Sequence, residues 1–365
     1  MTWNHTSISR LLKIDYPIVQ APMAGGITVP KLVSAVSEAG ALGSVGAGYL
    51  TSLQLDQQIK EIKGLTGKPF NVNLFVPEKE AGISKENILA MKGVLEKFNM
   101  PAEDISFTYE KSQSNYEKQL EAVLQNDVPI CSFTFGLPSI EAVRELKRAG
   151  RIVMGTATTV EEALLFEERG ADVIVMQGSE AGGHRGTFKS SADSCIGTMA
   201  LVPQAADALS LPIIAAGGIA DARGIAAALI LGADAVQLGS VFIPCTESGA
   251  PSAYKAKVLS SNEDETVLTR AFSGKYARGI KNDFIQKMKP FENSILPYPV
   301  QNEMTKSLRS HAAQELNSEN MSLWAGQGLR MITESLTAKE ILDRLIGQVN
   351  AVTDSSWKGL NANGS

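Results

Sequence analysis

The sequence predicts an α/β protein of the (β/α)8 barrel class, in which eight parallel strands alternate with helices. One observation is a repeated junction, at which a helical segment ends in a glycine and passes directly into an apolar run. Glycine accepts the left-handed conformation that ends a helix, and such short connections build parallel sheets. A second observation is that four further apolar runs bring the number of strands to eight. The junction glycines are Gly40, Gly150, Gly170 and Gly232.

The first strand and helix illustrate how each unit is bounded. Pro17 can open a strand but cannot sit within its ladder, and Pro22 ends the run. Pro30 suits the first position of the following helix, which ends at Gly40. A doubly wound open sheet is the alternative fold, and it also binds ligands at the carboxyl ends of its strands. The eight predicted strands are 16–20, 41–47, 70–76, 128–135, 151–157, 171–177, 212–216 and 233–239.

Two segments of the sequence are additional to the strands and helices of a minimal (β/α)8 barrel. Residues 77–114 are polar with weak helical character, and residues 244–324 are long, polar and rich in turns. They follow the third and eighth strands, so we expect both to form a cap over the carboxyl-terminal face of the barrel. An amphipathic run at 337–352 is expected to close the barrel as its last helix. The predicted units are a barrel (1–243), a cap (244–324), a helical closure (325–353) and a disordered tail (354–365).

Composition and charge narrow the classes of partner. The net charge is only -5 and no dense basic block occurs, so neither a nucleic acid nor a membrane surface is an expected partner. The three cysteines are an odd number without a C-x-x-C pair, which indicates a reducing compartment. Without a secretory signal or a long apolar run, the expected location is cytoplasmic. The sequence contains no His/Cys/carboxylate cluster of the kind that holds a catalytic metal, so no metal is expected. Whether the chain forms a homo-oligomer is left open.

The strand at 171–177 leads into a glycine-rich loop that carries the main candidate for chemistry, His184. Glycines there let the backbone approach a ligand closely. An imidazole with a pKa of about 6.5 is mostly neutral near pH 7, so it can accept a proton or donate a hydrogen bond. The alternative is a solvated loop histidine. Glu180 and Arg185 flank it, and an ion pair between them is the structural alternative to a chemical role.

A phosphate site is indicated at two neighbouring strand ends. Gly217 and Gly218 follow the seventh strand and precede a helix that Asp221 can cap, and residues 237–240 follow the eighth strand. In a barrel these loops are adjacent, so their N–H groups can hold a phosphate together. Neither a G-x-x-x-x-G-K-[ST] loop nor a G-x-G-x-x-G turn after the first strand is present.

Six motifs together resemble the nitronate monooxygenase family, in its bacterial class I, once called 2-nitropropane dioxygenase. They are QAPMAGG (20–26), NVNLF (71–75), QGSEAGGHRG (177–186), AAGGIADARG (215–224), QLGS (237–240) and AFSGKYARGIKN (271–282), so the resemblance covers nearly the whole chain. It implies an FMN-dependent barrel that oxidises nitronates, such as propionate 3-nitronate, with dioxygen to a carbonyl compound and nitrite. Nitronate detoxification is the role usually given to the family.

The resemblance also assigns roles to residues. His184 takes the base-like catalytic role, and Lys275, Arg278 and Tyr298 of the long insertion are candidates for contact with the substrate, a surface turn being the alternative. The isoalloxazine ring would lie beside Ala21, Pro22 and Met23, with Asn73 and Gln177 supplying polar contacts. The remaining cofactor-binding residues would be Gly182, Gly217, Gly218, Gln237, Leu238, Gly239 and Ser240.

Three other functions stay open at this point. An FMN-dependent reductase of the enoyl-acyl-carrier-protein type shares a barrel and a Gly-Gly-His loop but consumes NADH or NADPH. A barrel lyase or isomerase could use the phosphate site for a phosphorylated substrate. A non-catalytic protein that binds flavin or phosphate is the third.

Overall fold

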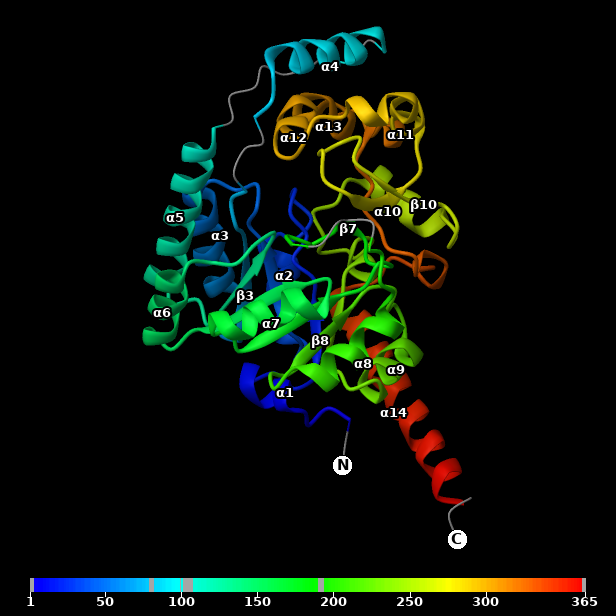
Figure 1. The fold of residues 1–365 in the computed structure, drawn as a ribbon. Helices are drawn as coiled ribbons and strands as arrows, with labels where there is room; N and C mark the ends of the chain where they lie inside the picture. The colour runs from blue at the N-terminus through cyan, green and yellow to red at the C-terminus, as the bar shows by residue number, and fades with distance from the viewer. Residues whose placement is uncertain (1–2, 79–81, 99, 101–107, 190–193, 363–365) are drawn as a thin grey trace.

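Eight parallel strands curl into a barrel with helices on its outside (Figure 1). This computed structural model describes residues 3–78, 82–98, 100, 108–189 and 194–362. The strand order is β1-β9-β8-β6-β5-β4-β3-β2. This order confirms the predicted barrel and excludes the alternative fold, an open doubly wound sheet. The barrel strands are β1 (Ile18–Gln20), β2 (Gly43–Gly46), β3 (Phe70–Phe75), β4 (Ile130–Thr134), β5 (Ile152–Ala157), β6 (Val173–Gln177), β8 (Ile213–Ala216) and β9 (Ala235–Leu238).

The barrel closes between β1 and β2, where the ladder is shortest. Val19 and Leu42 form a single parallel bridge there, and the N–H of Gln20 donates to the carbonyl of Leu42 at 2.9 Å. The side chain of Gln20 is fully buried and continues the pairing. Its Oε1 accepts from the N–H of Ser44 at 3.0 Å, and its Nε2 donates to the carbonyl of Ser44 at 3.2 Å. A buried side-chain amide therefore replaces ladder bonds at the seam.

Helices cover the outside of the barrel, and most begin at a side-chain cap. Thr51, Ser139, Thr159 and Asp221 each accept an N–H from the first turn of their helix. The last helix packs against α2 and α9 and fills the eighth position of the ring. It extends beyond residue 352 into the predicted tail, whose residues 363–365 lie outside the described part. The ring comprises α2 (Pro30–Glu38), α3 (Ser52–Leu65), α5 (Tyr109–Gln125), α6 (Ile140–Arg148), α7 (Val160–Arg169), α8 (Thr198–Ala208), α9 (Ala222–Ile230) and α14 (Ala338–Ala362).

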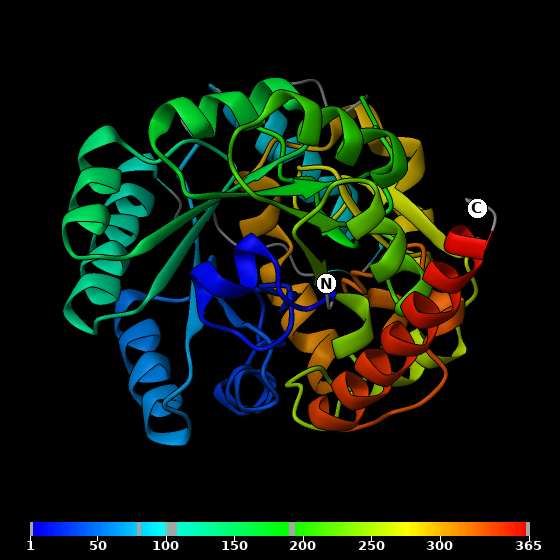
Figure 2. The same ribbon diagram turned by 90° about the horizontal axis from the view of Figure 1, so that it is seen from below.

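The interior of the barrel is apolar at one end and polar at the other. At the amino-terminal end, Met154 and Val175 pack against Ile8 and Leu12 of α1 (Ser7–Leu12), which covers the opening (Figure 2). Nearer the carboxyl ends, the inward-facing side chains become polar. Because successive residues of a strand face opposite sides, the outward positions stay apolar and pack on the helices. The inward polar residues are Ser44, Asn71, Asn73, Ser132, Thr134 and Thr156.

Both insertions lie over the carboxyl-terminal face, as predicted (Figure 1). From the insertion after β3, α4 (Lys85–Lys97) packs Met91 and Leu95 into a cluster with Phe272 and Phe284 of the second insertion. Residues 79–81, 99 and 101–107 of the predicted segment 77–114 lie outside the described residues. The second insertion contains α10 (Ser252–Ser260), β10 (Thr266–Thr269), β11 (Ala277–Ile280), α11 (Asp283–Met288), η2 (Lys289–Ser294), α12 (Val300–Met304), α13 (Lys306–Gln314) and η3 (Ser318–Asn320), and it is flanked by η1 (Ser240–Phe242) and η4 (Leu329–Met331).

A small antiparallel sheet joins this cap to the barrel. Its strand β7 (Gly183–His184) comes from the loop after β6 and pairs with β11, which in turn pairs with β10. Ala277 of β11 stands opposite His184. The sequence predicts an irregular loop here, because two residues are too few to give a periodic pattern. The pairing fixes the position of His184 relative to the cap.

Candidate active site

A cleft of about 1170 Å³, its mouth included, opens at the carboxyl ends of the strands beneath the cap. Ligand sites of barrel enzymes lie at this face. Leu238, predicted to bind the cofactor, lies outside the lining, because its side chain points into the core beneath the helices. The other predicted cofactor residues and the predicted catalytic residue all line the cleft: Ala21, Pro22, Met23, Asn73, Gln177, Gly182, His184, Gly217, Gly218, Gln237, Gly239 and Ser240.

One end of the cleft presents a group of backbone N–H donors. Gly217 and Gly218 adopt φ angles of 115° and 70°, a conformation that glycine reaches without strain. Within the described ranges, the N–H groups of these two residues and of Gly239 and Ser240 have no acceptor in the protein. The Oγ of Ser240 accepts from the N–H of Gly326 at 2.9 Å. Unpaired N–H groups from two adjacent loops make a site suited to an oxyanion.

Two loop segments form a wall of the cleft by direct backbone contact. A Cβ atom on Gly182 would lie 2.5 Å from the carbonyl carbon of Ala325, closer than real Cβ contacts. A Cβ atom on Gly326 would lie 2.6 Å from the carbonyl oxygen of Glu180. Glycine at both positions therefore lets the loop after β6 pack against the segment that returns from the cap.

His184 lies in an aromatic environment at the wall of the cleft. Its ring centre is 5.4 Å from that of Trp324, 5.7 Å from that of Phe135 and 6.3 Å from that of Tyr298. Its Nε2 lies 2.8 Å from the Oγ of Ser273. Burial, with a smaller contribution from nearby cationic side chains, lowers the pKa of His184 from 6.5 to about 3. The imidazole is therefore neutral throughout the physiological range.

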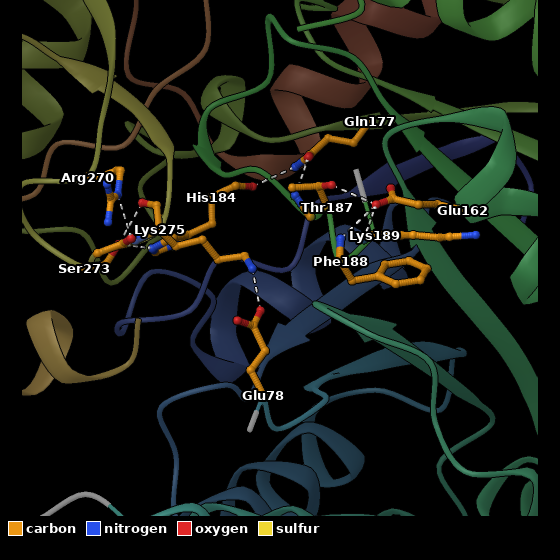
Figure 3. Close-up of polar contacts among 12 residues, drawn as sticks. Glu78, Glu162, Gln177, His184, Thr187, Phe188, Lys189, Arg270, Ser273 and Lys275 are labelled. Carbon is orange, nitrogen blue, oxygen red and sulfur yellow. Dashed lines mark hydrogen bonds and ion pairs between the residues drawn. The ribbon is translucent and has the colours of Figure 1, made fainter. Parts of the chain in front are cut away.

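The backbone around His184 is fixed from two sides (Figure 3). Gln177 donates from Nε2 to the carbonyl of His184 at 3.0 Å, and its Oε1 accepts from the N–H of Gly186 at 2.8 Å. On the other side Glu162, fully buried, accepts from the Thr187 hydroxyl at 2.7 Å and from the Phe188 N–H at 2.8 Å. Burial alone would raise the pKa of Glu162, but these and further hydrogen bonds to the carboxylate lower it. The carboxylate thus stays ionised and holds the loop.

Two of the three predicted substrate residues lie near His184 but outside the lining of the cleft. Lys275 forms an ion pair with Glu78, and its Nζ lies 4.7 Å from the centre of the Phe135 ring (Figure 3). The ring of Tyr298 lies 5.6 Å from that of Phe135, and burial raises the pKa of its hydroxyl. Lys275 therefore adds positive charge beside His184, whereas Tyr298 adds a protonated phenol. Their contact with a substrate stays a prediction.

The third predicted substrate residue, Arg278, lies below the wall of the cleft. Its Nε donates to the carbonyl of Ser179 at 2.9 Å, and its Nη1 donates to the Oγ1 of Thr266 at 3.2 Å. The side chain is buried, at 8% exposure. Arg278 therefore ties β11 to the loop after β6, a structural contact that its position in the sequence did not reveal.

Glu180 and Arg185 do not pair with each other, contrary to the structural alternative considered for them. Glu180 accepts from the N–H of Thr198 at 2.9 Å and from its hydroxyl at 2.8 Å. Arg185 donates to the carbonyls of Gln177 and Gly178 at 3.1 and 2.7 Å. Arg185 therefore reaches back to the start of the loop, whereas Glu180 binds the first turn of α8.

Several residues in or beside the cleft were not predicted from the sequence. Phe135 ends one predicted strand and Tyr49 follows another, so their positions could have been inferred from the barrel. Ser273 and Trp324 lie in the long insertion, where only the adjacent glycines hint at a close approach to the site. Arg309, on α13, raises the positive charge around His184. Nothing local marks Arg309, because a single arginine on an amphipathic helix usually faces solvent.

In the part of the chain that the structure describes, no three His, Cys, Asp or Glu side chains are placed to hold a metal ion. Over the same residues, no helix has the length and apolar character needed to cross a bilayer.

Similarity to known proteins extends over most of the chain. The family model described as nitronate monooxygenase matches residues 5–348. A probable nitronate monooxygenase of Bacillus subtilis (strain 168) is 52% identical over 330 residues, which cover 90% of this chain and 94% of that protein. Nitroalkane oxidase from Streptomyces ansochromogenes is 39% identical with a TM-score of 0.87, covering 95% of this chain and 99% of its own. FabK from Thermotoga maritima is 30% identical with a TM-score of 0.78, covering 97% and 99%.

Proposed function

The chain belongs to the nitronate monooxygenase family, and from this premise we propose that it oxidises alkyl nitronates with dioxygen, using FMN, to a carbonyl compound and nitrite. The observation that carries the proposal is a neutral, partly buried histidine in a cleft that also holds a separate group of unpaired N–H donors. Nitronate detoxification is the cellular role we propose, by the resemblance to the family.

The residues of the cleft fit FMN. The N–H groups of Gly217, Gly218, Gly239 and Ser240 would hold the phosphate, whose charge matches unpaired backbone donors. The small and apolar side chains of residues 21–23 would border the ring system. When bound, the flavin supplies the electron transfer from the nitronate to dioxygen. The protein then has to bind the anion, orient it and exclude water.

The electrostatics around His184 favour a substrate that is already a nitronate. A base whose pKa is about 3 is too weak to remove a proton efficiently from the carbon of a neutral nitroalkane. A neutral imidazole can still hydrogen-bond to a nitronate oxygen, and the positive charges of Lys275 and Arg309 attract the anion. We therefore assign His184 the role of binding and orienting the nitronate.

One experiment separates this function from its alternatives. The purified yellow protein is mixed anaerobically with a nitronate, and separately with NADH or NADPH, while the flavin absorbance is followed; air is then admitted and nitrite measured. We expect bleaching by the nitronate and nitrite on aeration. Bleaching by NADH or NADPH without nitrite would support the reductase. A colourless protein after flavin loading would favour a lyase or isomerase, and full flavin occupancy without any reduction would favour a binding protein.

Variants of two histidines test the assignment of His184. We expect His184→Asn to lower the rate of flavin reduction by a nitronate about tenfold, the usual scale for losing one hydrogen bond to a charged group. His311→Asn is the matched control, since His311 lies on the cap surface with 64% of its side chain exposed. Equal rates in the two variants would exclude a direct role for His184.

A further inference from the structure

Trp324 lies on the segment that returns from the cap, beside His184. It is partly buried and lines the cleft. The centre of its ring system is 5.4 Å from the centre of the imidazole, and the two ring planes are inclined by 57°. Its main chain is held by the cap, since its carbonyl accepts from the hydroxyl of Tyr254 and the residue forms an antiparallel bridge with Gly279. Trp324 is therefore a fixed neighbour of the histidine.

The indole of Trp324 packs against the cap on the side away from its nitrogen. A Cβ atom on Gly279 would lie 2.9 Å from the Cε3 of Trp324, so glycine leaves room for the ring. The ring of Phe272 lies 5.6 Å away and nearly perpendicular, at 87°. Because Cε3 and Nε1 are on opposite edges of an indole, the edge that carries the N–H is the one farther from Gly279.

Two nitrogens of these neighbouring rings have no partner in the protein. An indole nitrogen can only donate, and the N–H of a tryptophan in the interior usually finds an acceptor. The Nε1 of Trp3 does so, donating to the Oδ1 of Asn350 at 2.6 Å. Over the described residues, the Nε1 of Trp324 has no acceptor. The Nε2 of His184 is engaged by Ser273, whereas its Nδ1 is unpaired over the same residues.

The pair of unpaired nitrogens suits a ligand with two oxygens on one atom. A nitronate is planar, and its two oxygens share the negative charge, so each is a strong acceptor. With 5.4 Å between the ring centres, both nitrogens can reach one small head group. A thioester, by contrast, presents a single carbonyl oxygen and would leave one of the two nitrogens without a partner.

We propose that the indole N–H of Trp324 donates to one oxygen of the nitronate while His184 binds the other. The inference rests on the proposed function for the identity of the ligand. It makes Trp324 a substrate-binding residue, and it assigns to the two rings together the selection of two-oxygen anions over compounds with one carbonyl oxygen.

Nuclear magnetic resonance of the flavin-loaded protein, with its tryptophans labelled with nitrogen-15, tests the contact without turnover. The chain has three tryptophans, so three indole N–H resonances are expected, and Trp324→Phe identifies one of them. The probe is butanoate, whose carboxylate has the planar two-oxygen shape of a nitronate. We expect butanoate to move the Trp324 proton resonance downfield, as a new hydrogen bond does. The Trp3 resonance is the internal control and should not move, because its N–H is already bonded.

Calorimetric titration with butanoate measures the contribution of the N–H to binding. Trp324→Phe should raise the Kd about 10- to 100-fold, the scale of a hydrogen bond to a charged group. Phenylalanine also removes part of the packing on Phe272, so a second protein carries 3-benzothienylalanine at position 324. This residue keeps the fused rings and has sulfur in place of the N–H, and it should weaken binding to the same extent. Trp3→Phe is the matched control and should leave the Kd unchanged.

Three results would overturn the proposal. The first is a Trp324 resonance that does not move at saturating butanoate. The second is full affinity in the benzothienylalanine protein, since the bulk of the ring and not its N–H would then matter. The third is an unchanged protein that does not bind butanoate, because two converging donors should hold such an anion.

Turnover separates this inference from the proposed function. If the function holds, Trp324→Phe should lower kcat/KM for a nitronate about 10- to 100-fold, whereas Trp3→Phe should not. Absence of nitrite from the unchanged protein would refute the function, while the butanoate titrations would still decide whether Trp324 binds a two-oxygen anion.

Discussion

The Oγ of Ser273 lies 2.8 Å from the Nε2 of His184 and also 3.1 Å from the carbonyl oxygen of Lys275. A serine hydroxyl has a single proton, and Nε2 is its closer acceptor, while its lone pairs can accept from the N–H of Lys275 at 3.3 Å. We therefore infer that neutral His184 carries its proton on Nδ1, which is left to donate to a nitronate oxygen. Ser273 thus fixes the tautomer from outside the cleft. Ser273 therefore acts as a positioning residue for His184.

Ser273→Ala should lower the rate of flavin reduction by a nitronate about tenfold, because the ring loses the contact that fixes its tautomer and orientation. Ser273→Thr keeps the hydroxyl and should recover most of the rate. The measurement is anaerobic stopped-flow reduction, with flavin content checked in each variant. A rate in Ser273→Thr as low as in Ser273→Ala would indicate a packing defect and contradict the positioning role.

Acid should destabilise the protein in part through His184. The folded-state pKa of about 3 lies below the ordinary value of 6.5, so the unfolded chain takes up a proton first as the pH falls. The contribution of His184 to stability is full above about pH 6.5 and decreases toward pH 3. Urea unfolding should show a loss of about 1–2 kcal/mol between about pH 7 and pH 5 that is absent in His184→Asn. The same slope in both proteins would place the titration elsewhere.

The sequence was sufficient for the barrel because its signals are local. A glycine at the end of a helix, followed by an apolar run, indicates the order of helices and strands along the chain. Because parallel strands end at the same face of the barrel, this order also places Gly217, Gly218 and Gly239 close together. The contacts of the cap were not predictable in this way. Ser273 and Arg309 reach the site through β11 and α13, and no pattern within either segment specifies which barrel loop it will meet. The side chain of Leu238 packs in the core, so a contact of Leu238 with the cofactor, which stays a prediction, would come from its backbone.

Glu162→Gln should loosen the loop that carries His184. The two carboxylate oxygens accept N–H groups of Thr158, Phe188 and Lys189, and an amide nitrogen in place of one oxygen would face donors. Leaving buried donors unpaired costs about 1–3 kcal/mol. The free energy of unfolding, measured in urea near pH 7, should fall by that amount.

The stabilising effect of Glu162 should itself depend on pH. Its folded-state pKa is lowered, so its contribution is present above about pH 4.5 and is lost as the pH falls through the folded-state value. Glu161→Gln is the matched control, because Glu161 is 61% exposed and forms a surface ion pair with Lys189. It should change stability by less than about 0.5 kcal/mol. Similar losses in the two variants would contradict a specific role for Glu162.

Gly182→Ala should disturb the wall of the cleft, since the added Cβ would lie 2.5 Å from backbone atoms of both Ala325 and Gly326. The loop after β6 and the segment 324–328 would have to separate, at a cost of about 1–3 kcal/mol in unfolding free energy. The matched control is Gly347→Ala, because a Cβ on Gly347 of α14 meets nothing within 4 Å. Alanine inside a helix should stabilise the protein by about 0.4–1 kcal/mol.

The wall adjoins the N–H donors of residues 217 and 218, so the affinity for flavin should fall in Gly182→Ala and not in Gly347→Ala. Fluorescence titration of the apoprotein with FMN measures this affinity. Unchanged flavin affinity with reduced stability would mean that the two segments support the fold without shaping the cofactor site.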